Sequence, residues 1–139
     1  MASANARGMA AKIEDLPIYA RATEFCVAVN TLLERPALRR NSRLRGQIEE
    51  ANDSIIANMH EGFEQPTDRA FANYLTYAKA SLAEVLGRLQ AARSKQYLTE
   101  EELTPPIALG EELGKMLGGF IKYLQRSDFK DRGRFCSRG

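Results

Sequence analysis

The residues in this chain best suited to chemistry are five arginines in and just after the short connection between two expected helices. No acidic residue lies between the first and the last of them. Arginine binds phosphate groups by charge and by parallel hydrogen bonds, without needing a base sequence. The pattern therefore predicts a nucleic-acid-binding surface, and the alternative is a solvated basic loop. The candidate residues are Arg35, Arg39, Arg40, Arg43 and Arg45.

Residues for catalysis or metal binding are scarce in the sequence. The single histidine is His60, and Ala57 occupies the position where a Glu-x-x-His metal motif needs its glutamate. Cys26 and Cys136 lie far apart in the sequence, which indicates unpaired thiols in a reducing compartment. We therefore expect a non-enzymatic protein with no cofactor and no metal, located in the cytoplasm.

The composition fits a single domain with an ordinary core. The chain has 139 residues, of which 44% are hydrophobic and 27% charged, and its net charge is +2. This net charge is too small to indicate nucleic-acid binding by itself, so the position of the charges must decide. No apolar run is long enough for a membrane span, and we expect no membrane partner.

The segment from Phe71 to Ala92 has the clearest pattern of the elements that must position these residues. Apolar residues recur in alternating steps of four and three, which is typical of a helix packed lengthwise against other helices. They are Phe71, Leu75, Ala78, Leu82, Val85, Leu89 and Ala92. Ala80, Ala83 and Gly87 form a second edge of small residues, which predicts close packing within the chain or between subunits.

Three other helices are expected around this one. The first begins near Asp15 with Pro17 in its first turn, and Pro36 ends it. The second begins at Asn41–Ser42 and ends at Gly62, where a left-handed glycine is expected. Thr67 caps the third helix.

The start of the fourth helix has two interpretations. Thr99 and Glu102 match a capping box, so a single turn can precede Pro105-Pro106. Alternatively, Thr104 caps the helix anew and the main helix begins there, which is the interpretation we favour.

Four helices joined by short turns predict an all-α fold, an antiparallel up-down-up-down four-helix bundle. The bundle covers residues 13–125, between a disordered leader at residues 1–12 and a basic flexible tail at residues 126–139.

Several polar and small residues are candidates for structure or assembly. Asn58 and Glu61 adjoin apolar residues and can form a binding site or, as we favour, polar groups that fix helix register. Glycines spaced by four in the last helix indicate either close backbone approach or a weak helix. The full set is Asn58, Glu61, Gly62, Ala80, Ala83, Glu84, Gly87, Gly114 and Gly118.

Three motifs give the chain a family resemblance. They are Ser54–Phe63 (SIIANMHEGF), Phe71–Leu75 (FANYL) and Ala80–Glu84 (ASLAE), followed by a Tyr97-Leu98 corner. In combination they resemble the bacterial four-helix-bundle family encoded in intervening sequences of large-subunit ribosomal RNA genes, over about residues 12–125. The chain departs from the family pattern after Gln47, where Ile48, Glu49 and Glu50 replace basic residues.

The resemblance implies a homopentameric ring with no catalytic residues. Distant relatives in this group include accessory proteins of diversity-generating retroelements, which bind nucleic acid and a reverse transcriptase. We therefore expect a homo-oligomer that binds RNA or DNA, most simply RNA, as an accessory protein, with a reverse transcriptase as a partner by distant analogy. The alternative is a protein–protein interaction scaffold that binds no nucleic acid.

Overall fold

Helices make up almost all of the computed structural model, which describes residues 10–138 and their side chains as far as Ser127. In chain order they are the 3-10 helix η1 (Ile13–Asp15), α1 (Pro17–Leu32), α2 (Pro36–Arg39), α3 (Ser42–Phe63), α4 (Asp68–Ser94) and α5 (Glu100–Arg138). Residues 10–138 contain no strand. The prediction of an all-α fold is confirmed.

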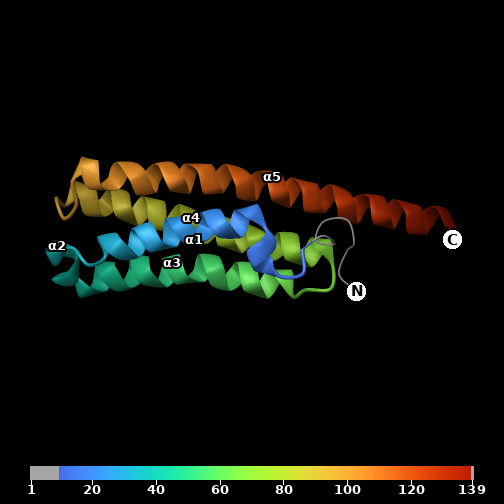
Figure 1. Cartoon of the computed structure of the whole chain (residues 1–139), viewed down its shortest axis with the longest axis horizontal. Helices are drawn as coiled ribbons and strands as arrows, with labels where there is room; N and C mark the ends of the chain where they lie inside the picture. Colours follow the sequence, from blue (N-terminus) through green and yellow to red (C-terminus); the bar gives the residue numbers. More distant parts are fainter. Residues whose placement is uncertain (1–9, 139) are drawn as a thin grey trace.

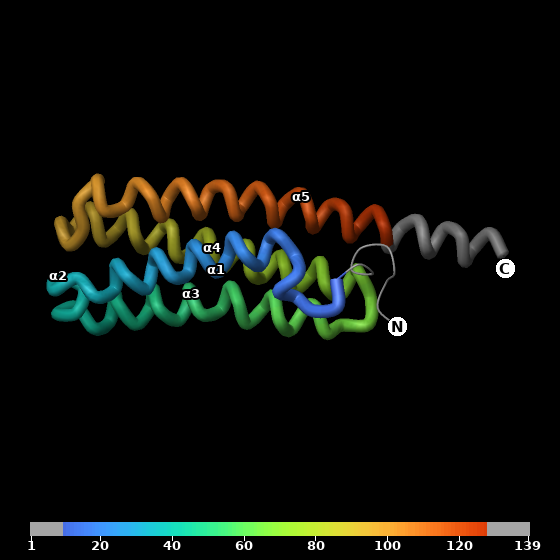
Figure 2. Tube along the Cα trace, viewed as in Figure 1, coloured from blue at the N-terminus to red at the C-terminus, as the bar shows by residue number. Residues whose placement is uncertain are grey.

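The four long helices lie side by side and alternate in direction (Figure 1). α3 packs against α4, α4 against α5, α5 against α1, and α1 against α3, so the four helices enclose one core. Figure 2 shows the same path as a tube, with the short helix α2 joining α1 to α3 at one end of the bundle. This is the up-down-up-down arrangement that short connections favour.

The apolar stripe of α4 lies at the centre of this core. Every member of the stripe, from Phe71 to Ala92, is at most 2% exposed. The rings of Phe71 and Phe120 meet edge to face, which joins α4 to α5, and Phe63 meets Phe71 in the same way from the end of α3. The regular spacing predicted this correctly, because a repeat of 3.5 residues keeps one face of a helix toward its neighbours.

The expected helix starts are confirmed where a side chain caps the helix. Thr67 Oγ1 accepts a hydrogen bond from the Ala70 amide at 3.1 Å at the start of α4. At the start of α5, the Thr99 amide donates to Glu102 Oε1 at 2.9 Å, and the Glu102 amide donates to Thr99 Oγ1 at 3.1 Å. The hydrogen bond from the Thr99 amide is the main cause that lowers the pKa of Glu102.

The favoured start of the fourth helix at Thr104 is wrong. α5 is continuous through Pro105 and Pro106, and Thr104 Oγ1 donates to the Glu100 carbonyl inside the helix. The prolines remove two amide groups early in the helix, but Leu103 and Pro106 are buried against the bundle. Tertiary packing therefore holds a helix that local propensity disfavours.

Two further expectations at helix ends are wrong. Pro36 does not end α1, which stops at Leu32; instead Pro36 is the first residue of α2, where its missing amide costs nothing. Gly62 does not end α3 in a left-handed conformation, because α3 continues to Phe63 and no glycine in the described residues has a positive φ.

The two ends of the chain fall partly outside the described residues. Of the expected leader at residues 1–12, only residues 10–12 are described. The backbone of α5 continues through Arg138, into the segment 126–139 for which we expected a flexible tail. The side chains of residues 128–139, that of Cys136 among them, lie outside the described part of the structure. In the described part of the chain, no helix combines the length and apolar character needed to cross a membrane.

Candidate nucleic-acid interface

The predicted arginine cluster is divided by the fold into paired and unpaired side chains. Arg35 Nε lies 2.6 Å from Glu102 of α5. Arg39 and Arg45 both contact Glu34, at 2.7 Å and 2.9 Å. Arg45 also donates to the Leu33 carbonyl, so it connects the start of α3 to the end of α1. These three arginines are therefore partly neutralised by carboxylates.

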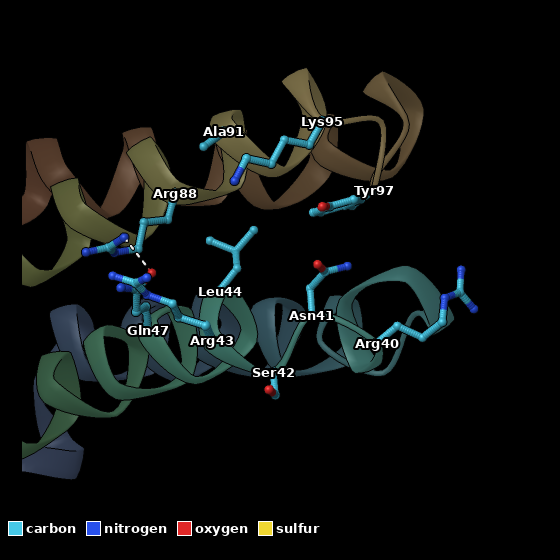
Figure 3. A pocket seen from close by; sticks show the side chains of 10 residues that line it. All are labelled: Arg40, Asn41, Ser42, Arg43, Leu44, Gln47, Arg88, Ala91, Lys95 and Tyr97. Carbon is cyan, nitrogen blue, oxygen red and sulfur yellow. Dashed lines mark hydrogen bonds between the residues drawn. The ribbon is translucent and has the colours of Figure 1, made fainter.

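Arg40 and Arg43 instead line a groove at the end of the bundle where α2 meets α3. This groove, which we call the basic groove, has a volume of about 630 Å³. Its wall on the other side comes from the last turns of α4 and the corner that follows (Figure 3). The lining residues are Arg40, Asn41, Ser42, Arg43, Leu44, Gln47, Arg88, Ala91, Lys95 and Tyr97.

The charges of the basic groove all have one sign. Among its lining residues, four are basic and none is acidic. Arg88 is fixed by two hydrogen bonds of 2.9 Å, from Nε to Glu84 and from Nη1 to Gln47 Oε1. Within the described residues, Arg40, Arg43 and Lys95 have no carboxylate partner. Figure 3 shows Arg40 directed away from the other three, so the centre of the charge is formed by Arg43 and Lys95 together with Arg88, which is partly neutralised by its ion pair with Glu84.

The two long helices that border the basic groove present opposite dipole ends to it, because α3 begins there and α4 ends there. α3 begins at Ser42, and the side-chain nitrogen of its cap residue Asn41 donates to the Ala37 carbonyl at 2.7 Å. The positive end of the α3 dipole lies on one side of the groove and the negative end of the α4 dipole on the other, so the anion preference rests on the basic side chains. A partly enclosed surface of one charge concentrates ions of the opposite sign.

A second, more acidic hollow bounds the basic groove along the α3–α4 interface. It has a volume of about 310 Å³ and shares Gln47 and Arg88 with the basic groove, but its other lining residues include Glu50 and Glu84. A polyanion in the basic groove would be repelled from this direction. It would therefore extend toward the end of the bundle instead.

Arg88 and Lys95 were missed as site residues by sequence reasoning. They are seven positions apart on one face of a single helix, and this spacing is the signal that could have identified them. Their partner Arg43 lies far away in the sequence. Only the antiparallel packing of α3 and α4 brings the three side chains to one groove.

The candidates for structure and assembly separate into two groups. Gly62 is buried inside the chain, and Gly114 and Gly118 lie between α5 and α4, near Leu82 and Lys79. The second group lies on α4 and is exposed. It consists of the small-residue edge (Ala80, Ala83 and Gly87) and the neighbouring Glu84. The chain's own α5 therefore does not cover this edge.

The two polar residues predicted on α3, Asn58 and Glu61, differ in burial and in hydrogen bonding. Asn58 is partly buried and donates to the Ser54 carbonyl and to Ser54 Oγ, which lies 2.9 Å from Ser81 Oγ of α4. This chain of hydrogen bonds links α3 to α4 and satisfies polar groups at their interface. Glu61 is exposed and does not join it.

A buried polar residue that sequence reasoning missed is Asn52. It is fully buried, and its side-chain nitrogen donates to the Cys26 carbonyl at 3.1 Å and to Asn30 Oδ1 at 3.2 Å. These bonds link α3 to α1. Among the described residues, no group of three or more His, Cys, Asp or Glu side chains could hold a metal ion.

Comparison with known proteins agrees with this fold. The model of the 23S rRNA-intervening sequence protein family matches residues 14–119. The chain belongs to this family. The expected resemblance to proteins from rRNA intervening sequences is thereby confirmed, and the match covers the bundle from η1 into α5.

A solved structure is similar to this member of the 23S rRNA-intervening sequence protein family. It is a Bacteroides thetaiotaomicron protein of unknown function from the S23 ribosomal protein family. The two chains are 25% identical with a TM-score of 0.66, and the match covers 76% of this chain and 98% of that one. No curated protein is significantly similar to this chain.

Proposed function

We propose that this protein is a non-enzymatic, self-associating helical bundle that binds nucleic acid, most simply RNA, in the cytoplasm as an accessory protein. The observation that carries this proposal is the basic groove, where Arg43, Arg88 and Lys95 meet with no acidic residue in the lining. Phosphate is the common group that such a surface favours, and a chain of phosphates can contact several of these cations at once.

Replacing Arg43 and Lys95 by alanine is the first test. The double variant is expected to bind a labelled single-stranded RNA about tenfold more weakly in fluorescence anisotropy at low salt. The slope of log K against log salt should fall by about 0.7 for each phosphate that the variant no longer neutralises.

The matched control is the double variant Arg35→Ala/Arg39→Ala, which removes the same charge from the paired arginines. It is expected to keep most of the affinity. An equal loss in both variants would mean that net charge and not the basic groove determines binding. Absence of any shift with RNA or DNA at low salt would refute the proposal.

Self-association is the second part of the proposal, and the exposed edge of α4 supports it. Ala80, Ala83 and Gly87 leave a helix surface with little side-chain bulk, and Tyr77 continues it with a side chain that is 57% exposed. Small residues let two backbones approach closely, and an exposed tyrosine can supply apolar contact area. The subunit number we propose is the five implied by the resemblance.

Native mass spectrometry tests the assembly. The unmodified chain is expected to give a homopentamer, and Ala83→Glu is expected to give monomers, because each interface would then bury an unpaired charge. Ala57→Glu is the control, since Ala57 is exposed on α3. A strict monomer at micromolar concentration would contradict the ring.

The same exposed edge is the observation that favours the second candidate function. A scaffold that binds a polypeptide through α4, and no nucleic acid, would use this edge without the basic groove. An oligomer that binds neither RNA nor DNA would support the scaffold. A reverse transcriptase remains a candidate partner for either function by distant analogy.

A further inference from the structure

We infer that the basic groove recognises unpaired nucleotides, in a single strand, with a base stacked on Tyr97. This inference rests on the proposed nucleic-acid binding and specifies its substrate class. The observation behind it is that an aromatic ring lines the same groove as the cations. Figure 3 shows the Tyr97 side chain opposite Asn41, with Leu44 between it and Arg43.

The Tyr97 side chain contacts both the hydrophobic core and the basic groove. The side chain is partly buried and packs against the hydrophobic core, yet it also lines the basic groove. Packing against the core fixes the orientation of the ring, so little conformational entropy is lost when a base stacks on it. Leu44 adds an apolar contact on the α3 side.

The corner that presents Tyr97 is held by two backbone hydrogen bonds. The Tyr97 amide donates to the Ala92 carbonyl at 2.9 Å, and the Gln96 amide donates to the Arg93 carbonyl at 2.8 Å. This is the Schellman arrangement, which needs a left-handed residue at its centre. Gln96 supplies it with a φ of 64°, although glycine is the residue that adopts this conformation most readily. As a result, Lys95 and Tyr97 lie on either side of this residue and both line the groove.

The arrangement of charge and ring matches the two parts of a nucleotide. Arg43 and Lys95, which have no carboxylate partner among the described residues, are suited to the phosphates, and the face of Tyr97 is suited to any base, because every base has a π face. In a duplex the bases are stacked inside the helix, so only the phosphates would be available to this groove. A single strand can supply both contacts.

The volume of the groove agrees with an occupant of nucleotide size. The value of about 630 Å³ lies within the range of about 300–1,000 Å³ that is typical of small-molecule sites. A free nucleotide offers the same chemistry as one unit of a strand. The cations extend from Lys95, just after α4, across to Arg43 on α3, which favours successive phosphates over a single one.

Substitution of Tyr97 separates stacking from charge. Tyr97→Leu keeps an apolar side chain for the core and removes the aromatic face, so single-stranded RNA is expected to bind about tenfold more weakly. Binding of a duplex RNA of equal phosphate number should not change. Tyr97→Phe keeps the face and is expected to retain the affinity of the unmodified chain for the single strand within about twofold.

The measurement is fluorescence anisotropy at one low salt concentration, with single-stranded and duplex RNA as separate probes. Circular dichroism melting of each variant shows that the bundle is intact. The expected result is tighter binding of the single strand, with a loss in Tyr97→Leu that is confined to the single strand.

Three other results have distinct meanings. Equal binding of single strand and duplex, both weakened in Arg43→Ala/Lys95→Ala and unaffected in Tyr97→Leu, would overturn the inference and leave the proposed function intact. Competition by nucleoside monophosphates as effective as by the strand, at equal nucleotide concentration, would overturn the strand as the occupant. Binding of neither probe would refute the proposed function itself.

Discussion

Replacing Gly62 by alanine is expected to lower the free energy of unfolding by about 2 kcal/mol, within the range of about 1–3 kcal/mol for overpacked cores. A Cβ at this position would lie 2.7 Å from Tyr74 Cβ and 2.9 Å from Phe71 Cδ1. Tyr74 Cβ is attached directly to the backbone of α4 and cannot rotate away. The new methyl group must therefore push α3 and α4 apart, and Phe71 is fully buried in the core between them.

The same substitution at two other glycines provides a comparison for the expected loss of stability. At Gly110 a Cβ would meet Leu86 Cδ2 and Phe25 Cε1, each at 2.8 Å, and the tip of Leu86 can move. Gly110→Ala is therefore expected to cost less than Gly62→Ala. At Gly119 nothing in the described residues lies within 4 Å of an added Cβ, so Gly119→Ala is expected to stabilise helix α5 by about 0.5–1 kcal/mol.

Urea unfolding followed by circular dichroism measures the three variants. Protein concentration must be the same for all, because self-association links stability to concentration. Equal stability of Gly62→Ala and Gly119→Ala would contradict the close packing of α3 on α4.

The second large effect is a slow alkylation of the Cys26 thiol in the folded protein. Burial, with a smaller contribution from the nearby Asp53 carboxylate, raises the pKa of this thiol from 9.0 to about 12. The side chain is only 9% exposed, and Sγ lies 3.6 Å from the Asn52 carbonyl. Because the thiolate is the reactive form, alkylation near neutral pH should be at least about a thousandfold slower in the folded protein than in urea.

Alkylation by iodoacetamide tests this in a Cys136→Ser variant, where Cys26 is the remaining cysteine. Similar rates in the folded and unfolded protein would contradict the burial of the thiol at the α1–α3 contact. Mass spectrometry of the intact chain follows the reaction.

The same thiol gives the protein a pH dependence at high pH. The unfolded thiol loses its proton near pH 9, while the folded thiol keeps it until about pH 12. The unfolded state therefore binds fewer protons in this window, so the Cys26 contribution lowers stability as pH rises from 9 to 12. Cys26→Ala should show a shallower fall over this range, and an unchanged slope would contradict the raised pKa.

The bundle was predictable because its determinants are local in the sequence. The steps of four and three from Phe71 to Ala92 select the buried face of α4 without reference to any other helix. Thr67, Thr99 and Glu102 fix helix starts through contacts within four residues. Such contacts depend on the identity and spacing of neighbouring residues, which the sequence states directly.

The errors occurred where distant residues compete with a local preference. Pro105 and Pro106 favour a break, but the burial of Leu103 and Pro106 on the bundle maintains α5. Gly62 favours a helix end, but its lack of a side chain serves the contact with Tyr74 and Phe71 instead. In both cases a contact across helices outweighs the preference of the residue itself.

The candidate site was predicted only in part for the same reason. The sequence by itself determined that basic residues gather around the start of α3, that one face of α4 is buried, and that the chain is a helical bundle. Only the tertiary structure decided that Glu34 and Glu102 neutralise three of the five arginines. It alone placed Arg43 opposite Arg88, Lys95 and Tyr97. Charge pairing and groove formation depend on distances between residues on different helices, and packing rather than sequence spacing sets these distances.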